Sequence, residues 1–417
     1  MNRSEIAAVR GFHPREVSAL VNDAVIEEHA REAALLWVQR TQAAHAAHYK
    51  LKHLARVDAR VIAHLRGLEV AGEAGWRAAQ AGLADLQPGT LFVATYVAFV
   101  SRDAQRMNQV LQLAVTDATF ERALVAAFGW IDPRLCTAAV ERLAASAATA
   151  YRRVACAAMV AHRFKAEHAL TLGVQDGDTE VRALALRAIG ENACRGLERA
   201  VEAGMRDPET ACRFWAAISR AFRNDAAAAR MAYDCGYGHP ELQGTAIDVA
   251  LRCGGDEWAR SLVRELASRP MDREEAIAAI GAFGDPVTIP WLLEQMVDPK
   301  YAKPAGQAFA LITGVDLAYE DLTLATDEDD ASSDDAELSM PDPAKVREWW
   351  MLHREAFVPG IRHLAGRPLS APVVLDVLRN GYQRQRAAAA LELAILNDVA
   401  IFPVAERADW QARRLQP

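Results

Sequence analysis

Apolar residues recur at helical spacing after the Asp-Pro steps of this chain. After Pro286 they stand three, six, seven and ten positions on, at Ile289, Leu292, Leu293 and Met296. The same offsets after Pro133 give Cys136, Ala139, Val140 and Leu143. Such offsets place side chains on one stripe of a helix. Proline costs no hydrogen bond in a first helical turn, and aspartate caps the free amides there. Each step therefore predicts a helix start.

These starts recur about every 30 residues. They lie 29 to 32 residues apart, at Pro88, Asp117, Ala148, Asp178, Pro208, Pro240, Pro270 and Pro299. Each precedes a helix rich in small and apolar residues, and shorter helices such as "RLCTAAVERLAA" and "DEWARSLVREL" lie between them. Glycines suited to left-handed caps stand at or just past the expected helix ends, at Gly129, Gly190, Gly255, Gly284 and Gly314. Because such pairs cannot bury both apolar sides alone, they are expected to stack.

The segment "DGDTEVRALALRAIGENA" is similar to the second helix of a HEAT repeat, with Asp178, Val181 and Arg182 followed by small residues. We therefore predict an all-α fold, an α-solenoid of HEAT-like helical hairpins with a period of about 30 residues. The expected domains are an N-terminal helical cap, the repeat array, an acidic flexible insertion and C-terminal helices that complete the solenoid. Their ranges are 1–84, 85–315, 316–342 and 343–417.

Charge is unevenly distributed. The formal net charge is −8, but residues 316–342 hold eleven acidic and no basic residues, which leaves 47 basic against 44 acidic residues elsewhere. This near-neutral body disfavours a general nucleic-acid-binding domain. Six cysteines without a Cys-x-x-Cys pair favour buried free thiols in a reducing cytosol. With neither a secretory signal nor a long apolar run in the sequence, we expect a soluble cytoplasmic protein with no membrane partner.

Few patterns indicate chemistry. His45 and His48 could share a helical face, but no Cys or carboxylate stands at matching spacing, so ordinary surface histidines are favoured over a metal site. Phosphate-loop and nucleophile-elbow motifs are missing from the sequence. The acidic run at 327–330 lacks the ligand spacing of a calcium loop. We expect no catalytic residue, no cofactor and no metal.

One charged pattern exceeds what packing requires. Four arginines stand 31, 29 and 31 residues apart, at Arg122, Arg153, Arg182 and Arg213. In one interpretation they brace neighbouring repeats through Asp178, Asp207 and backbone carbonyls. In the other they form a cationic partner-binding track for an acidic protein segment, or for residues 316–342 as a self-masking element. Thr245, Glu275 and Pro304 occupy the later equivalent places, which confines any track to the first half.

Adjacent tryptophans at 349 and 350 cannot face one way on a helix, so we expect one in the core and the other over a seam or a partner.

Three stretches resemble an uncharacterised HEAT-like family of proteobacteria. They are "LARVDARVIAHLRGLEVAGEAGW", "AIGAFGDPVTIPWLLEQMVDP" with the following "AGQAFALITGVDL", and "VREWWMLHREAFVPGIRHLAGRP" with the following "VLRNGYQRQRAAAALELA". Members are often encoded near type VI secretion genes and have no established catalytic residues. They tend to carry Glu where this chain has Gln307.

The leading hypothesis is a non-enzymatic protein-binding scaffold, adaptor or chaperone. The resemblance implies a secretion effector, its chaperone or a spike component as the partner. One alternative is an immunity protein that neutralises a toxin. Another is a HEAT-like DNA-binding enzyme of the base-glycosylase type, which the near-neutral body and the short arginine series disfavour.

Overall fold

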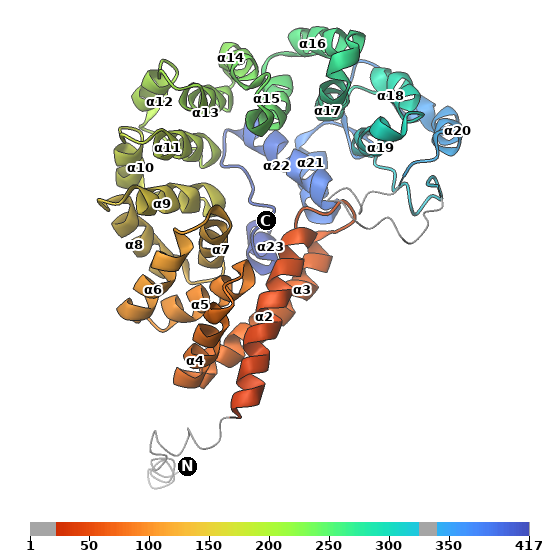
Figure 1. Cartoon of the computed structure of the whole chain (residues 1–417). Helices are drawn as coiled ribbons and strands as arrows, with labels where there is room; N and C mark the ends of the chain where they lie inside the picture. Colours follow the sequence, from red (N-terminus) through yellow and green to blue (C-terminus); the bar gives the residue numbers. More distant parts are fainter. Residues whose placement is uncertain (1–21, 325–339, 417) are drawn as a thin grey trace, which may run out of the picture. The chain divides into compact units, whose positions relative to one another are not determined.

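The computed structural model describes residues 22–324 and 340–416, which form two compact units. The first comprises residues 22–42 and 55–136, and the second comprises 43–54 and 137–416. Apart from one two-stranded hairpin and two isolated bridges, the regular structure of these residues is helical (Figure 1). The all-α class is thus confirmed. The domain boundaries at 84, 315 and 342 stay predictions.

The first unit is built around its most apolar helix. Its elements are α2 (Asp23–Ala43), α3 (Leu51–Ala71), α4 (Glu73–Ala81), η3 (Gly82–Ala84), α5 (Pro88–Val100), α6 (Ala104–Ala114), α7 (Ala118–Phe128) and the start of α8 (Pro133–Ala144). Residues 91–99 of α5 are all buried, and Phe92 stacks on Trp37 of α2 with ring centroids 4.6 Å apart. A buried ion pair joins α2 to α3, with Arg40 Nε 2.8 Å from Asp58 Oδ1.

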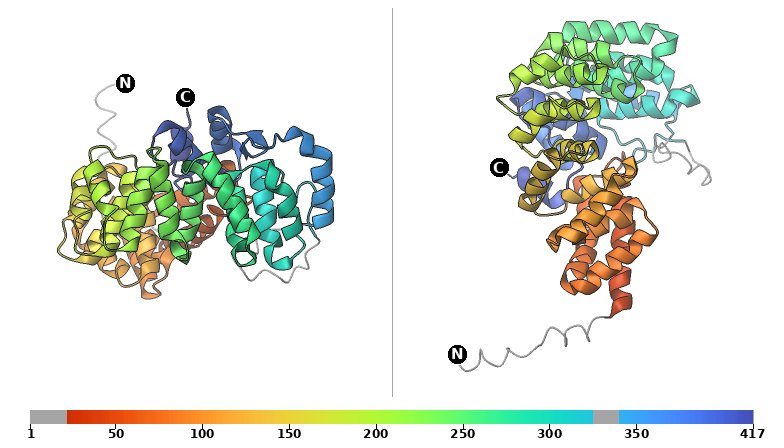
Figure 2. Two further views of the ribbon diagram at one scale, coloured as in Figure 1. Left: turned by 90° about the horizontal axis from the view of Figure 1, so that it is seen from above. Right: turned by 60° about the vertical axis from the view of Figure 1, so that its left-hand side comes forward.

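In the second unit, six helices form a row in which each contacts the next (Figures 1 and 2). They are α9 (Thr149–His162), α11 (Thr179–Glu191), α13 (Thr210–Ala221), α15 (Pro240–Cys253), α17 (Arg273–Phe283) and α19 (Pro299–Thr313). Between them along the chain come α10 (Glu167–Gly173), α12 (Glu198–Gly204), α14 (Ala226–Gly236), α16 (Asp256–Ser268), η4 (Pro270–Asp272), η5 (Pro286–Thr288) and α18 (Ile289–Gln295).

The predicted helix starts agree closely with the structure. Pro88, Pro240 and Pro299 are first helical residues, and Asp117, Ala148 and Asp178 are N-caps. Pro208 lies two residues ahead of α13, and Pro270 opens a 3-10 turn ahead of α17. The spacing of Pro and Asp residues in the sequence therefore marks where the helices begin in the structure.

Two of the five predicted glycine caps are left-handed. Gly284 has φ 80° and Gly314 has φ 74°, and they end α17 and α19. The prediction is wrong for Gly129, which is right-handed, and for Gly190, which lies inside the last turn of α11. Gly255 has φ 91° but precedes α16 as its N-cap.

The C-terminal part of the second unit follows residues 316–342. It comprises α20 (Pro343–His353), η6 (Arg354–Ala356), β1 (His363–Leu364), β2 (Arg367–Pro368), α21 (Ala371–Asn380), α22 (Gln383–Asn397) and α23 (Ala408–Arg414). The hairpin strand β1 and its turn bond to the C-terminal ends of α17 and α19, because His363 N donates to Gly284 O and Ala365 N donates to Leu311 O.

The two ends of the acidic segment pair with each other. Leu324 N donates to Met340 O at 2.9 Å, and Asp342 N donates to Leu322 O at 2.8 Å. The insertion is predicted to be flexible over residues 316–342, of which 325–339 lie outside the described residues. Its flexibility stays a prediction. The tryptophan prediction is confirmed: Trp350 is buried, while Trp349 is partly buried and packs edge-on against Phe309.

Candidate functional site

The four predicted arginines differ in their surroundings. Arg122 is exposed on α7, in the first unit. Arg153 lies on α9 with its Nη1 3.5 Å from Glu180 Oε2. Arg182 and Arg213, on α11 and α13, are only partly exposed and donate to nearby backbone carbonyls. A partner-binding role for these four residues stays a prediction.

Arg152, the neighbour of Arg153, makes the contacts that match those of Arg182 and Arg213. All three guanidinium groups donate to the carbonyls six and five residues earlier. The acceptors are Ser146 and Ala147 for Arg152, Asp176 and Gly177 for Arg182, and Asp207 and Pro208 for Arg213, at distances of 2.6 to 3.2 Å. These arginines hold the turns that lead into their own helices.

Two aspartates connect these turns. Arg152 binds both carboxylate oxygens of Asp176 at 2.5 and 2.9 Å, and Arg182 binds both of Asp207 at 3.0 and 3.2 Å. Each aspartate offers its carboxylate to one arginine and its carbonyl to the next. We call the connected residues Arg152, Asp176, Arg182, Asp207 and Arg213 the arginine–aspartate network. The expected contact of Asp207 with one of these arginines is present, whereas Asp178 caps α11 instead.

The network shifts the protonation of its carboxylates. The hydrogen bond from Arg152 holds the pKa of Asp176 below its ordinary value. Burial alone would raise the pKa of Asp207, but hydrogen bonds from Arg182 and from the Glu209 N–H lower it. Both aspartates are therefore stabilised as anions, as bracing requires.

The C-terminal residues pass close to the ends of α9 and α11. We call residues 398–403 the C-terminal strap. Ile401 N donates to Glu191 O at 2.8 Å, and Arg163 Nε donates to Ile401 O at 3.1 Å. Arg195 pairs with Asp398 at 2.5 Å. These helix ends thus hold an extended piece of the chain itself.

A second buried link joins α22 to the row. Glu392 accepts a hydrogen bond from Arg362 and lies 3.0 Å from Arg252 Nε. Arg252 is buried on α15, and its Nη1 also pairs with Asp248 at 2.8 Å. Burial would lower the pKa of Arg252, but the charges of Asp248 and Glu392 raise it. The cluster connects α22, α15 and the segment before β1.

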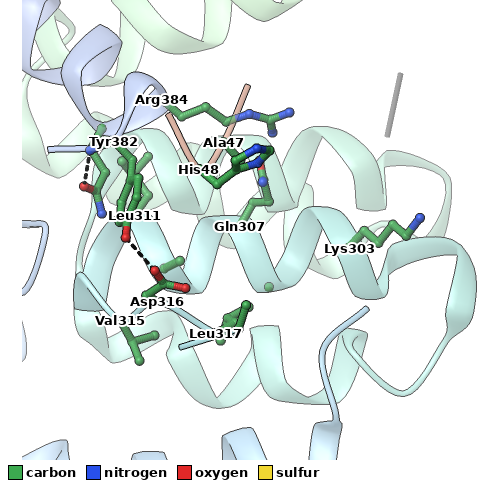
Figure 3. A pocket seen from close by; sticks show the side chains of 14 residues that line it. Ala47, His48, Lys303, Gln307, Leu311, Val315, Asp316, Leu317, Tyr382 and Arg384 are labelled. Carbon is green, nitrogen blue, oxygen red and sulfur yellow. Dashed lines mark hydrogen bonds between the residues drawn. The ribbon is translucent and has the colours of Figure 1, made fainter. Parts of the chain in front are cut away.

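A pocket of about 130 Å³ opens where α19 meets the start of α22 and the turn between α2 and α3 (Figure 3). Leu311, Val315 and Leu317 supply apolar wall, and Gln307 contributes an amide. The basic side chains that line it come from three segments: His48, Lys303 and Arg384. We call this cavity the α19 pocket. It combines apolar surface with a few convergent polar groups, which is typical of a ligand site.

One wall of the α19 pocket is fixed by a tyrosine–carboxylate pair. Tyr382 Oη donates to Asp316 Oδ2 at 2.5 Å, while Tyr319 N donates to the other oxygen at 3.1 Å. Lys50 Nζ lies 4.3 Å from the centre of the Tyr382 ring. Burial and the hydrogen bond to Asp316 raise the pKa of Tyr382 to about 12, so the phenol stays a donor at neutral pH.

Sequence reasoning missed the α19 pocket because its walls are far apart in the chain. Residues 47–48, 303–318 and 382–385 meet only through the tertiary fold. Of the positions singled out in the sequence, Gln307 does line the pocket.

Large apolar side chains are exposed in a short stretch after the buried Trp350. Met351 is 54% exposed, Leu352 75%, Val358 48% and Ile361 45%. We call residues 351–361 the apolar turn. Single exposed apolar residues are ordinary, but several within one short stretch favour an interaction surface.

Metal and thiol chemistry find little support in the part of the chain that is described. His45 and His48 lie in the turn after α2, and no group of three or more potential ligands is suited to a metal ion there. All six cysteines are unpaired; four are buried and Cys235 and Cys253 are partly exposed.

No described helix has both the length and the apolar character needed to cross a membrane. Comparisons with protein-family models, with curated proteins and with solved structures found no match to this chain.

Proposed function

We propose that this protein is a non-enzymatic protein-binding scaffold, with its second unit built as an α-solenoid of HEAT-like helix pairs. The ordered row from α9 to α19 and the arginine–aspartate network support the repeat architecture. The exposed apolar turn carries the binding function, because clustered apolar surface is stabilised when a partner covers it.

Hydrogen bonds at Gly360 fix one end of the apolar turn to the rest of the second unit. Gly360 N donates to Asp285 Oδ1 at 2.9 Å, and Arg260 Nη2 donates to Gly360 O at 2.8 Å. Phe357 is buried, so the exposed residues on either side of it are presented from a fixed point. A preorganised surface loses less entropy on binding than a mobile one. This favours the apolar turn as a docking site.

The resemblance described above favours a secretion-associated partner: an effector, its chaperone or a spike component. The accessible arginines of the predicted track, Arg122 and Arg153, would then add electrostatic steering toward an acidic partner surface. A soluble cytoplasmic location is part of this proposal.

The test is an affinity capture from native lysate at two salt concentrations, read by mass spectrometry. The baits are the wild type, a Met351→Ser/Leu352→Ser variant and an Arg122→Ser/Arg153→Ser variant. Met271→Ser serves as the matched control, because Met271 is 91% exposed and lies in η4.

We expect a protein that the wild type and Met271→Ser retain and the apolar-turn variant loses. The arginine variant should retain less of it than the wild type at low salt, and this difference should shrink at higher salt, where exposed charges are screened. Equal capture by all four folded baits would contradict the apolar turn as the docking site. Capture of nucleic acid alone would contradict the scaffold function.

A further inference from the structure

The size of the α19 pocket limits what it can hold. Its volume of about 130 Å³ is close to the roughly 150 Å³ of an apolar protein cavity that admits benzene. One leucine- or phenylalanine-sized group therefore fits, whereas a nucleotide does not. Leu311, Val315 and Leu317 provide apolar contact for such a group.

The polar lining favours an anion beside that apolar group. His48, Lys303 and Arg384 all line the pocket, and in Figure 3 they lie apart from the Tyr382–Asp316 pair. An ammonium has three donors and a guanidinium five, so each can serve more than one acceptor. A guanidinium binds a carboxylate with two parallel hydrogen bonds.

Among the described residues that line the pocket, Asp316 is the one acidic side chain, and both its oxygens already accept hydrogen bonds, from Tyr382 and from Tyr319 N. The Asp316 carboxylate is thus already hydrogen-bonded by residues of the pocket wall. In Figure 3 the Lys303 side chain on α19 and the Arg384 side chain at the start of α22 both extend away from Asp316, as two separate cationic groups.

We propose that the α19 pocket binds the C-terminal residue of a partner polypeptide, with its carboxylate at Lys303 and Arg384 and its apolar side chain against Leu311 and Leu317. A chain end combines a carboxylate and one side chain, which matches the basic and apolar groups in the lining, and the rest of the partner extends into solvent. This inference rests on the proposed scaffold function and specifies one of its contacts.

The experiment uses the full chain and fluorescence anisotropy of a short Gly-Ser peptide that ends in leucine and is labelled at its N-terminus. One form has a free carboxylate and the other a terminal amide. A competition arm uses N-acetyl-leucine, which carries the same carboxylate without a polypeptide. The variants are Lys303→Gln/Arg384→Gln and Gln307→Glu.

Lys300→Gln/Arg413→Gln is the matched control. It removes the same charge, and Lys300 stands one turn before Lys303 on α19 without lining the pocket. Gln307→Glu keeps the shape of the side chain while adding a negative charge to the pocket, so it tests the electrostatics without risking the fold.

We expect the free-carboxylate peptide to bind at least about tenfold more tightly than the amide, since a hydrogen bond to a charged group is worth about 1.5–3 kcal/mol. Both pocket variants should lose at least that factor and the control should not. Equal binding of acid and amide, or unchanged binding by both folded pocket variants, would overturn the proposal. N-acetyl-leucine should compete about as well as the unlabelled peptide, because the pocket contacts only the terminal residue; a failure of N-acetyl-leucine to compete would overturn the assignment.

The outcome is separable from that of the scaffold test. Peptide binding that survives in the Met351→Ser/Leu352→Ser variant would support the pocket even if the apolar turn fails to retain a partner.

Discussion

Arg182 and Asp207 are 25 residues apart in the chain and meet through two hydrogen bonds, Nε to Oδ2 at 3.0 Å and Nη2 to Oδ1 at 3.2 Å. Their side chains are 16% and 13% exposed, so solvent screens them little. The pair fixes the start of α11 to the turn before α13. This contact fixes the position of α11 relative to the turn that leads into α13.

Replacing Arg182 with Ala should lower the free energy of unfolding by about 1–3 kcal/mol, because Asp207 and two backbone carbonyls lose their donors. Arg182→Lys should recover only part of this, since an ammonium cannot bind both carboxylate oxygens in the same way. Urea denaturation followed by circular dichroism measures the change. The exposed Arg122→Ala should stay within about 0.5 kcal/mol of the wild type; an equal loss there would argue against the network.

The lowered pKa of Asp176 makes the free energy of unfolding depend on pH. Its pKa is lowered in the folded protein by the hydrogen bond from Arg152, so the unfolded state binds its proton first as the pH falls. The stabilisation is present above the unfolded pKa of about 3.9 and is lost at lower pH. Asp176→Asn should therefore be less stable than the wild type at neutral pH, and the difference should shrink near pH 3. A difference independent of pH would contradict the assignment.

The sequence allowed the helix starts to be predicted because their signals are local: an N-cap aspartate or a first-turn proline acts within a few residues. The arginine network was only partly predictable. Arg152 and Arg153 are adjacent, and their spacings to Arg182 differ by one residue. Only the folded turn at 146–147 shows that Arg152 makes the equivalent contacts.

The C-terminal strap and the α19 pocket were beyond prediction for a different reason. Each depends on contacts between residues more than 200 positions apart, such as Arg163 with Ile401 or Gln383 with Ala44. The hydrophobic periodicity of one segment does not show which distant segment that segment will contact.

The first unit contains a histidine pair with its own pH response. His29 Nδ1 and His64 Nδ1 lie 3.0 Å apart, so one of the two nitrogens carries the hydrogen between them. Burial, and then the charge of His29, lower the pKa of His64, while Glu28, Glu32 and Arg60 exert smaller influences. The contribution to stability is thus present above pH 6.5, the ordinary histidine pKa, and is lost as the pH falls through the lower folded pKa.

His64→Gln should therefore flatten the fall in melting temperature between pH 7.5 and pH 5, an interval that spans the histidine pKa of about 6.5. Differential scanning calorimetry across that interval measures it. His168→Gln, at an exposed position on α10, is the control and should leave the profile unchanged. A profile that both variants leave unchanged would show that the pair does not titrate as described.

The cysteines should be almost inert in the folded protein. Burial raises the pKa of Cys136, Cys156 and Cys253 to about 12, and that of Cys212 to about 11. Because the thiolate is the reactive form, a disulfide reagent at pH 8 should modify the native protein slowly and all six thiols rapidly in denaturant. Rapid native modification of Cys136 or Cys156, identified by mass spectrometry, would contradict their burial.

Glu392 offers the sharpest test of how the C-terminal helices are held. Its carboxylate is buried between Arg252 and Arg362, and Arg252 lies almost entirely out of solvent. Removing one partner of a buried ion pair leaves a charge without compensation, which typically costs about 3–5 kcal/mol. Glu392→Ala should show a loss of that order in urea denaturation, together with faster proteolysis near residues 398–407. Replacing the pair with apolar residues, Arg252→Met with Glu392→Leu, should restore part of the stability, because the buried guanidinium of Arg252 is removed together with Glu392. Arg362 and the half-exposed Asp248 still lose one partner each. A double variant as unstable as Glu392→Ala would show instead that Arg362, which also donates to Phe283 O, depends on Glu392 to hold β1 against α17.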